Sequence, residues 1–373
     1  MGSNMGILHR GAIAAMGFSI IFAGCASDPN QQVWTTKNQS MLTVRTDTPS
    51  LSLGDAPVPS GPAVSAAELR QPALSILLQA ADSPSSLLRA NAIEALSAAP
   101  ETLEPIVQRG LADENRGVRF VSAMSVGKHK FINLAPLLEP LLHDESQSVQ
   151  AAAMYGLRRC GRPIDLNPLL TMLLADDAEV KGNAALVLGE LGDKSAIAVL
   201  RSSIGKGLHR ATQARRKIVE LQIVEAMVKL GATHDLEVIR AALFVPVEEA
   251  ELAALACQMC GELKDGSAVP DLSNLIHRTG KWERPAEIRM TAAMAIARIN
   301  PSRILVEVPA GYANSNRPEL RAQAAHTMGV MGGNGKQMLV ALSHLSRLLA
   351  DANPLVQVAA AGSVLRLEAS SAG

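Results

Sequence analysis

Apolar and polar residues alternate along the chain with the period of a helix. This helical pattern itself recurs at a longer interval. In Glu179 to Leu200, apolar or small side chains stand one position before Lys181 and three, four, seven and ten positions after it. This spacing places them on one face of a helix. The pattern returns around nine marker positions, 30 to 39 residues apart: Arg89, Arg119, Gln150, Lys181, Glu220, Ala253, Arg289, Arg321 and Gln357. A period of this length predicts an array of helical hairpins.

The third position after each marker is small in eight of the nine repeats. These residues are Ala92, Ser122, Ala153, Ala184, Ile223, Ala256, Ala292, Ala324 and Ala360. Small side chains let packed helices approach to the short end of the usual range of about 8–10 Å. The pattern therefore predicts close helix packing at this position.

A shorter helix is predicted before each marker helix, and several of these shorter helices end in an aspartate. The aspartates are Asp82, Asp113, Asp144, Asp176 and Asp351. A carboxylate at such a turn can accept hydrogen bonds from the free amides at the start of the next helix. We therefore interpret them as turn and capping residues and not as catalytic acids.

The composition agrees with closely packed helices. Hydrophobic residues make up 48% of the 373 residues, but aromatic residues only 2%. A core without large rings is filled most readily by closely spaced helices rich in Ala and Leu. The formal net charge is zero, so no overall positive field attracts nucleic acid.

The repeats resemble HEAT repeats, in particular the HEAT-like repeats that are also found in phycobilin lyases. The residues that match best are Val180, Lys181, Ala184, Ala185, Leu188, Gly189, Leu191, Gly192, Asp193 and Ala196. The resemblance extends over residues 66–373 and implies an all-α fold, an α-solenoid or superhelix of about nine helical hairpins. It is weaker in repeats five to seven, which differ in loop length and in which Glu220 and Ala253 replace the basic marker. Proteins of this family usually bind other proteins.

The N-terminus has the features of an export signal. An apolar run from Gly11 to Ala23 follows His9 and Arg10, which is the length of a signal-peptide core and short for a membrane span. The run ends in "FAGC", which resembles the lipobox of bacterial lipoproteins although Phe22 stands where Leu is commoner. The resemblance implies that residues 1–24 are removed and that Cys25 is acylated. An ordinary signal peptide with a chance cysteine is the alternative.

The lipoprotein resemblance also implies a location. Ala26 after the acylated cysteine, in place of Asp, implies sorting to the outer membrane of a Gram-negative cell envelope. Residues 25–65 are rich in Pro, Ser, Thr, Asn and Gln, which is typical of a flexible tether. The segments "VWTT" and "MLTV" around "KNQS" are compatible with a small hairpin that would let Trp34 contact the first repeat.

The cysteines and glycine-rich segments do not indicate an active site. Cys257 and Cys260 form a C-x-x-C motif, which is compatible with redox chemistry or metal binding, but both stand at core positions in the middle of a predicted helix. Cys160 also takes the place of a core residue. The segment "GVMGGNGKQ" lacks the residues of a phosphate loop at Val330 and Gln337. We therefore predict no catalytic residue, no metal and no cofactor, and a protein that is not an enzyme.

Two lengthened connections are strongly basic. They contain Lys206, Arg210, Arg215, Arg216 and Lys217 in repeat five, and Arg278, Lys281, Trp282 and Arg284 in repeat seven. Both join the two helices of one repeat, so both lie on the same edge of the solenoid. Together they suit an acidic partner segment or anionic lipid headgroups, with Trp282 as the apolar anchor. The connection of repeat six carries Glu248, Glu249 and Glu251, which interrupt the positive charge and favour a patterned protein surface over nucleic acid. Ordinary solvated insertions are the alternative.

These features favour a lipid-anchored scaffold or adaptor of the bacterial cell envelope that binds a protein partner through the solenoid. The alternative is a lyase-like enzyme or enzyme subunit related to the phycobilin lyases, which rests only on the repeat type. The export signal argues against that alternative, because a chromophore lyase would act in the cytosol.

Overall fold

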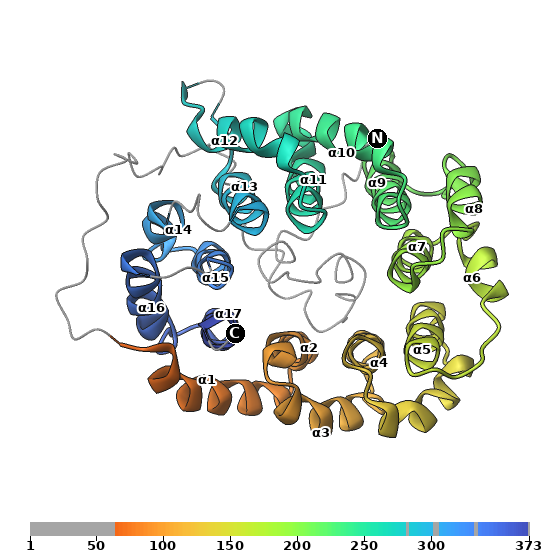
Figure 1. Ribbon diagram of the computed structural model, residues 1–373, viewed down its shortest axis with the longest axis horizontal. Coiled ribbons are helices and arrows are strands. Elements are labelled where there is room, and N and C mark those ends of the chain that lie inside the picture. Colours follow the sequence, from red (N-terminus) through yellow and green to blue (C-terminus); the bar gives the residue numbers. More distant parts are fainter. Residues whose placement is uncertain (1–63, 281–282, 301–305, 332–334, 372–373) are drawn as a thin grey trace, which may run out of the picture.

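The computed structural model describes residues 64–371, except 281–282, 301–305 and 332–334, and these residues form an all-α solenoid closed into a ring (Figure 1). One helix of each repeat lines the inside of the ring. In chain order, these inner helices are α2 (Ser86–Ala95), α4 (Arg116–His129), α5 (Gln147–Arg159), α7 (Ala178–Leu191), α9 (Gln213–Lys229), α11 (Ala250–Glu262), α13 (Ala286–Ile299), α15 (Pro318–Met328) and α17 (Pro354–Ser371). We number the repeats one to nine by these helices.

The outer layer is shorter and less regular. It consists of α1 (Ala66–Ala81), α3 (Pro100–Gly110), the 3-10 segments η4 (Ile132–Leu138) and η5 (Pro140–His143), α6 (Asn167–Met172), α8 (Ala196–Ser203), α10 (Leu236–Ala241), α12 (Val269–His277), α14 (Glu307–Tyr312) and α16 (Lys336–Leu348). Short 3-10 turns extend several helices: η3 (Leu96–Ala98), η6 (Thr233–Asp235), η7 (Ala242–Phe244), η8 (Val247–Glu249) and η9 (Gly266–Ala268). Among the described residues, the nine predicted hairpins are confirmed. The first helix is the shorter one except in repeat one, where α1 has 16 residues and α2 has 10, and in repeat three, where η4 and η5 stand in its place. No helix of the described residues is both long and apolar enough to span a membrane.

The first and last repeats meet and close the ring. Helix α1 packs against both α2 and α17, and α17 also packs against α2. Arg70 of α1 binds Glu368 of α17 and, at 2.8 Å, Glu101 of α3. At the same seam a Cβ on Gly362 would lie 2.7 Å from the Cβ of Ala95, so the two inner helices touch directly. The sequence pattern predicted a solenoid but not this closure.

Small residues set the spacing of the helices, as predicted. All nine side chains at the third position after the marker are fully buried. At Ser122 the close neighbour is the outer helix of the same repeat, where a Cβ on Gly110 would lie only 2.2 Å from the Ser122 hydroxyl oxygen. The small residue at this position therefore brings the two helices of a hairpin together.

A second small position, which the sequence analysis did not identify, brings consecutive inner helices together. The eighth residue after the marker is a glycine in repeats two, four, six and eight: Gly127, Gly189, Gly261 and Gly329. A Cβ on Gly189 would lie 3.0 Å from the Cα of Ala226, and one on Gly261 would lie 2.8 Å from the Cα of Ala295. These contacts are with backbone, which cannot move aside as a flexible side chain can.

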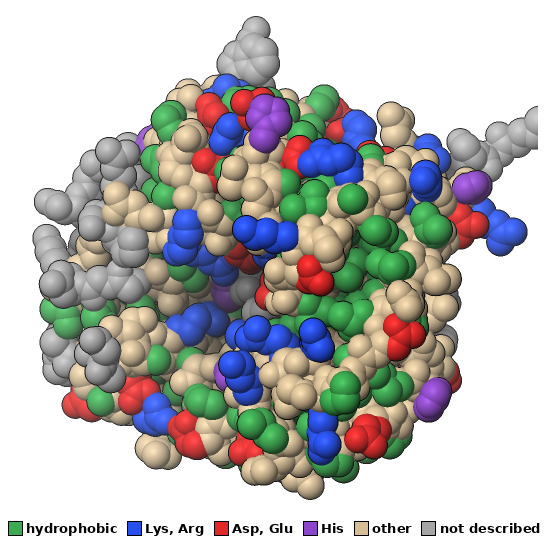
Figure 2. Space-filling view, turned by 45° about the vertical axis from the view of Figure 1, so that its right-hand side comes forward, with side chains coloured by type: hydrophobic (Ala, Val, Ile, Leu, Met, Phe, Trp, Pro, Cys, Tyr) green, Lys and Arg blue, Asp and Glu red, His purple; other side chains and the backbone are tan. Residues whose placement is uncertain are grey.

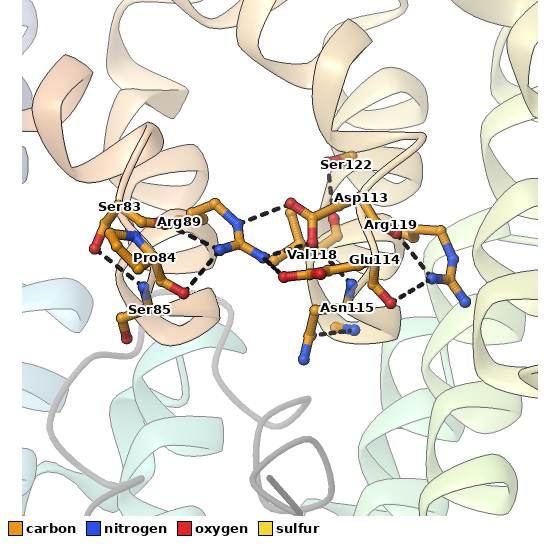
Figure 3. Close-up of polar contacts among 11 residues, drawn as sticks. Ser83, Pro84, Ser85, Arg89, Asp113, Glu114, Asn115, Val118, Arg119 and Ser122 are labelled. Carbon is orange, nitrogen blue, oxygen red and sulfur yellow. Dashed lines mark hydrogen bonds and ion pairs between the residues drawn. The ribbon is translucent and has the colours of Figure 1, made fainter. Parts of the chain in front are cut away.

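Arginine and aspartate residues link consecutive repeats on the edge where the inner helices begin (Figure 3). The guanidinium of Arg89 donates to both oxygens of Asp113, at 2.8 and 2.7 Å, and a third nitrogen donates to the carbonyl of Ser83. Arg119 binds Asp144, and Arg321 binds Asp351, in the same two-pronged manner. Paired, half-buried contacts of this geometry are stronger than exposed ion pairs.

Three of the five aspartates, Asp113, Asp144 and Asp351, also have the turn role that the sequence predicted, with one difference. Asp82 instead binds Arg109, and Asp176 accepts the amide of His209 in the next connection. Oδ1 of Asp113 accepts the amide of Asn115 at 2.8 Å, and Asn115 is itself the residue that caps α4. In the same way, Asp144 accepts the amide of Ser146 and Asp351 accepts the amide of Asn353. The hydrogen bond from Arg321 holds the pKa of Asp351 below its ordinary value. These carboxylates are structural, since their oxygens are occupied by an arginine and a backbone amide.

Replacing Gly261 by Ala is expected to lower the free energy of unfolding by about 1–3 kcal/mol, because the added methyl group meets the backbone of α13. Gly182→Ala is the matched control, since its Cβ meets only the end of the Gln222 side chain. The control should be neutral or stabilising by up to about 1 kcal/mol, because alanine favours a helix over glycine. Urea unfolding followed by circular dichroism measures both, and equal stability of the two variants would contradict the packing described.

Candidate functional site: one edge of the ring and its interior

The structure places the predicted basic residues on the edge where the inner helices begin, but in different environments. Lys206 and Arg210 are exposed in the connection between α8 and α9, and Arg216 is exposed in the first turn of α9. Arg215 and Arg278 are half-buried. Lys281 and Trp282 lie outside the described residues, as does Cys25.

Two of the residues predicted to bind a partner, Lys217 and Arg284, instead bind other residues of the same chain. For these two residues the structure corrects the prediction. Nζ of Lys217 donates to both carboxylate oxygens of Glu249, at 2.6 and 2.9 Å. Arg284 is buried, and its Nη1 donates to the carbonyl oxygen of Val245 at 3.0 Å. Both residues therefore reach from repeats five and seven to the connection of repeat six and hold the three connections together.

Lys181 fixes the basic connection from the other side. Its side chain is buried, and its Nζ donates to the carbonyl of Ser203 at 2.8 Å and to that of Lys206. Leu208, with a positive φ of 58°, is also buried in this connection. The exposed cations Lys206 and Arg210 therefore stand on a backbone that is held at several points.

Two exposed apolar residues lie in the middle of this edge, and the sequence analysis missed them. Phe244 is 47% exposed and Val247 is 48% exposed. Phe244 directly precedes Val245, which Arg284 binds, and Val247 stands two residues before Glu249, which Lys217 binds. The sequence could have indicated them, because Phe244 and Val247 are apolar residues near Pro246 in a connection, where they belong to no buried helix face. We call residues 204–217, 244–249 and 278–285, without 281–282, the five-to-seven edge.

The interior of the ring is a second polar region. Figure 2 shows a hollow in one face with lysine and arginine side chains gathered around its mouth. Charged or ionisable residues recur at the fifth and ninth positions after the marker, on the faces of the inner helices that the outer helices do not cover. We call nine of them the inner cluster: Glu94, Lys128, Glu190, Glu225, Lys229, Glu262, Arg298, His326 and Arg366.

Several members of the inner cluster form ion pairs between neighbouring inner helices. Lys229 lies 2.8 Å from a carboxylate oxygen of Glu190 and 3.0 Å from one of Glu225. Arg298 lies 3.1 Å from a carboxylate oxygen of Glu262. Burial raises the pKa of Glu225 to about 7, and the nearby ammonium of Lys229 opposes that rise.

Other members interact across the ring. The ammonium of Lys128 in repeat two interacts electrostatically with Glu94, Glu190, Arg366 and Glu262, which belong to repeats one, four, nine and six. The inner cluster therefore converges from distant repeats on one region. This convergence requires the ring, because an open array would separate its first and last repeats.

The cysteines lie where the core positions predicted. Cys257 and Cys260 are fully buried within α11, and both thiols are free. Burial raises the pKa of Cys260 to about 12 and that of Cys257 further, so both thiols carry their protons at neutral pH in the fold described. Cys160 is half-buried against the core. In the described ranges, no three His, Cys, Asp or Glu residues are grouped as metal ligands.

Comparisons with known proteins support the repeat type. A family model described as HEAT repeats matches residues 134–215, from the outer layer of repeat three to the start of α9. The hairpins in that range are therefore similar to HEAT repeats. No curated protein sequence matches the chain.

Solved structures with similar folds are distant. The complex of CpcE and CpcF of phycocyanin lyase from Nostoc sp. PCC7120 is 17% identical, with a TM-score of 0.39 over 76% of this chain and 98% of that one. An engineered protein is 18% identical, with a TM-score of 0.29 over 83% of this chain and 92% of that one. At these values neither similarity bears on function.

The inner cluster predicts how stability depends on pH. Burial raises the pKa of Glu94 to about 8 from an ordinary value of 4.5, although Lys128 and Arg366 oppose the rise. Between these two values the folded chain holds a proton that the unfolded chain releases, so this contribution to stability is lost as pH rises towards 8. The free energy of unfolding of Glu94→Gln should equal that of the wild type at pH 4. At pH 9 it should be higher than that of the wild type by on the order of 1–3 kcal/mol.

Urea unfolding at pH 4, 7 and 9 measures this difference. Glu319→Gln, which removes an exposed carboxylate from α15, is the control and should not change the pH dependence in the same way. If the curves of Glu94→Gln and the wild type stay parallel at all three values, Glu94 is not buried as described.

Proposed function

We propose that the protein is a non-enzymatic scaffold of the bacterial cell envelope, anchored by a lipid on Cys25, which binds a protein partner through the five-to-seven edge. The partner segment that fits this edge is acidic and carries at least one apolar side chain. The observation that carries the proposal is the exposed pair Phe244 and Val247 on an edge with exposed cations.

The chemistry of this edge is that of a protein interface. Aromatic and aliphatic side chains that are shielded on binding supply most of the affinity, while charged groups at the margin steer the encounter. Here Phe244 and Val247 provide the apolar centre, and Lys206, Arg210 and Arg216 provide positive charge on the repeat-five side.

The contacts within the edge favour binding without large rearrangement. Because Lys217 and Arg284 join three successive connections, the exposed residues between them are presented by a constrained backbone. A constrained surface loses less conformational entropy on binding than three independent loops would.

The membrane location rests on the sequence. The lipobox-like "FAGC" and the polar residues 25–65 would place the ring at a distance from the membrane on a tether. Acyl chains at Cys25 would hold the protein on the membrane, because each buried methylene contributes about 0.8 kcal/mol and several chains bind far more durably than one.

Replacing Cys25 by Ala is therefore expected to move the protein out of the membrane fraction and to abolish incorporation of labelled palmitate. Cys160→Ala is the control and should keep both the label and the location, since Cys160 lies half-buried in the solenoid. Absence of label from the wild-type protein would show that the lipoprotein interpretation is wrong.

Replacing Phe244 by Ser, or both Arg210 and Arg216 by Glu, is expected to reduce recovery of the partner at least about tenfold from solubilised envelope extracts. The charge-reversal effect should shrink as salt rises, because exposed charges are screened over about 8–10 Å near physiological ionic strength. Quantitative mass spectrometry of the captured proteins, at low and high salt, measures this recovery. Trp282→Ala, in a parallel arm, tests the residue predicted from the sequence alone.

The matched control reverses two exposed cations on the opposite edge, Arg162 and Lys194, to Glu. This control should recover the same proteins as the wild type. If all variants recover the same proteins equally while remaining folded, the edge is not the binding surface. A different outcome would show that the edge contacts lipid and not protein. In that case anionic vesicles bind the wild type but not the Arg210 and Arg216 variant, and the recovery of every protein is the same for both.

A further inference from the structure

Arg366 stands on the inner wall of the ring beside the seam. It is the ninth residue after the marker of repeat nine, on α17, between α15 on one side and α2 across the seam. Gly329 of α15 lies so close to α17 that a Cβ there would be 2.4 Å from Ser363. This approach brings His326 of α15 within reach of Arg366.

The hydrogen bonds of Arg366 are all to neutral groups. Its Nη2 lies 2.8 Å from the hydroxyl oxygen of Ser363 and 3.1 Å from Nδ1 of His326. Because Nδ1 faces an arginine donor, it is the acceptor, and the ring carries its proton on Nε2. Nε of Arg366 is enclosed and has no hydrogen-bond partner.

No carboxylate balances this guanidinium in the part of the chain that the structure describes. Its neighbour Arg298 is paired with Glu262 at 3.1 Å, and Arg321 with Asp351 at 2.7 Å, but no acidic oxygen lies within 4.0 Å of Arg366. Burial lowers the pKa of Arg366 to about 10, and the charge of Arg298 acts in the same direction. Enclosing a charge is costly unless an opposite charge or several hydrogen bonds compensate it.

Glu94 faces Arg366 from repeat one, but the two groups form no ion pair within 4.0 Å. The two groups interact electrostatically, and Oε1 of Glu94 is enclosed without a hydrogen-bond partner. Since burial raises its pKa to about 8, Glu94 is mostly protonated at neutral pH and can donate a hydrogen bond. Lys128 of repeat two adds a further positive charge within reach of both.

We propose that Arg366, with Ser363, His326, Glu94 and Lys128 around it, forms a binding site for an oxyanion, either a carboxylate or a phosphate group. The anion would accept hydrogen bonds from the terminal nitrogens of the Arg366 guanidinium and supply the charge that the fold lacks there. This inference goes beyond the proposed function, since it involves neither the lipid nor the five-to-seven edge.

The site joins the two ends of the solenoid. Glu94 and Lys128 belong to repeats one and two, whereas His326 and Arg366 belong to repeats eight and nine. An anion held between them would therefore bind the closed ring better than an open one. Binding of a ligand to only one of two states stabilises that state according to the ligand concentration relative to Kd.

The test uses the full chain purified in detergent and isothermal titration calorimetry with two probes. One probe is inorganic phosphate, and the other is a short glycine peptide with a free C-terminal carboxylate, compared with its amidated form. Binding of phosphate alone identifies a phosphate site, and binding of the free peptide but not the amidated one identifies a carboxylate site. Failure of both probes to bind overturns the proposal.

Arg366→Gln should weaken binding of the active probe by about tenfold to a hundredfold, because it removes a charged hydrogen-bond donor. Arg347→Gln is the matched control, since Arg347 also contacts a histidine, His344 at 3.0 Å, but is exposed on the outer helix α16. It should bind as the wild type does. Equal binding by both variants would place the anion elsewhere and overturn the proposal.

A measurement on the wild type covers the case in which Arg366→Gln does not fold. The ring nitrogens of His326 are assigned in ¹⁵N spectra by comparison with His326→Gln, and the active probe is then titrated. The Nδ1 signal of His326 should shift in step with binding, because Arg366 bonds directly to it. A probe that binds without moving this signal would contradict the site.

Discussion

Contact between the first and last inner helices is the constraint on which the rest of the structure depends. Gly362 leaves room for Ala95, and α1 covers the junction, so that the solenoid has no free end among the described helices. The contact requires the rotation between successive repeats to add up to one turn over nine units. Each rotation is set by how closely neighbouring inner helices approach, which glycines such as Gly189 and Gly261 decide through contacts with backbone.

Closure changes what a repeat array can do. In an open solenoid each repeat contacts only its neighbours, and polar side chains on the inner face are separated by the curvature of the array. In the ring, Lys128 interacts with acids and an arginine from four other repeats. The same arrangement encloses Nε of Arg366 and Oε1 of Glu94 without hydrogen-bond partners. The interior is thus a site produced by assembly of the whole fold, whereas the five-to-seven edge is a local product of three successive connections.

Charged residues in this protein divide into those that hold the backbone and those that remain exposed. Arg89 and Arg119 bind an aspartate of the next repeat, Lys181 binds carbonyl groups, and Lys217 joins two connections. These groups maintain the spacing of the repeats and are not available to a partner. Arg210 and Arg216 lie in the same part of the sequence and are exposed. A count of basic residues in a loop therefore overstates the charge that a partner meets.

The sequence by itself determined the repeat, its nine units, the buried face of each inner helix, the small third position and the turn role of three of the aspartates. These features depend on contacts within one hairpin or between neighbours, so they appear as a local period. The same period identified Cys257 and Cys260 as core residues. Interactions that are local in the chain can be predicted from local patterns.

Only the tertiary structure decided the closure of the ring, the meeting of Glu94 with Arg366, the burial of Arg284 and the exposure of Phe244. Closure depends on small rotations that accumulate over nine repeats, and no local pattern records their sum. Glu94 and Arg366 are far apart in sequence and come together only because the ends meet. Arg284 and Phe244 lie in connections, where the path of the backbone, and not a helical period, determines which side chains are covered.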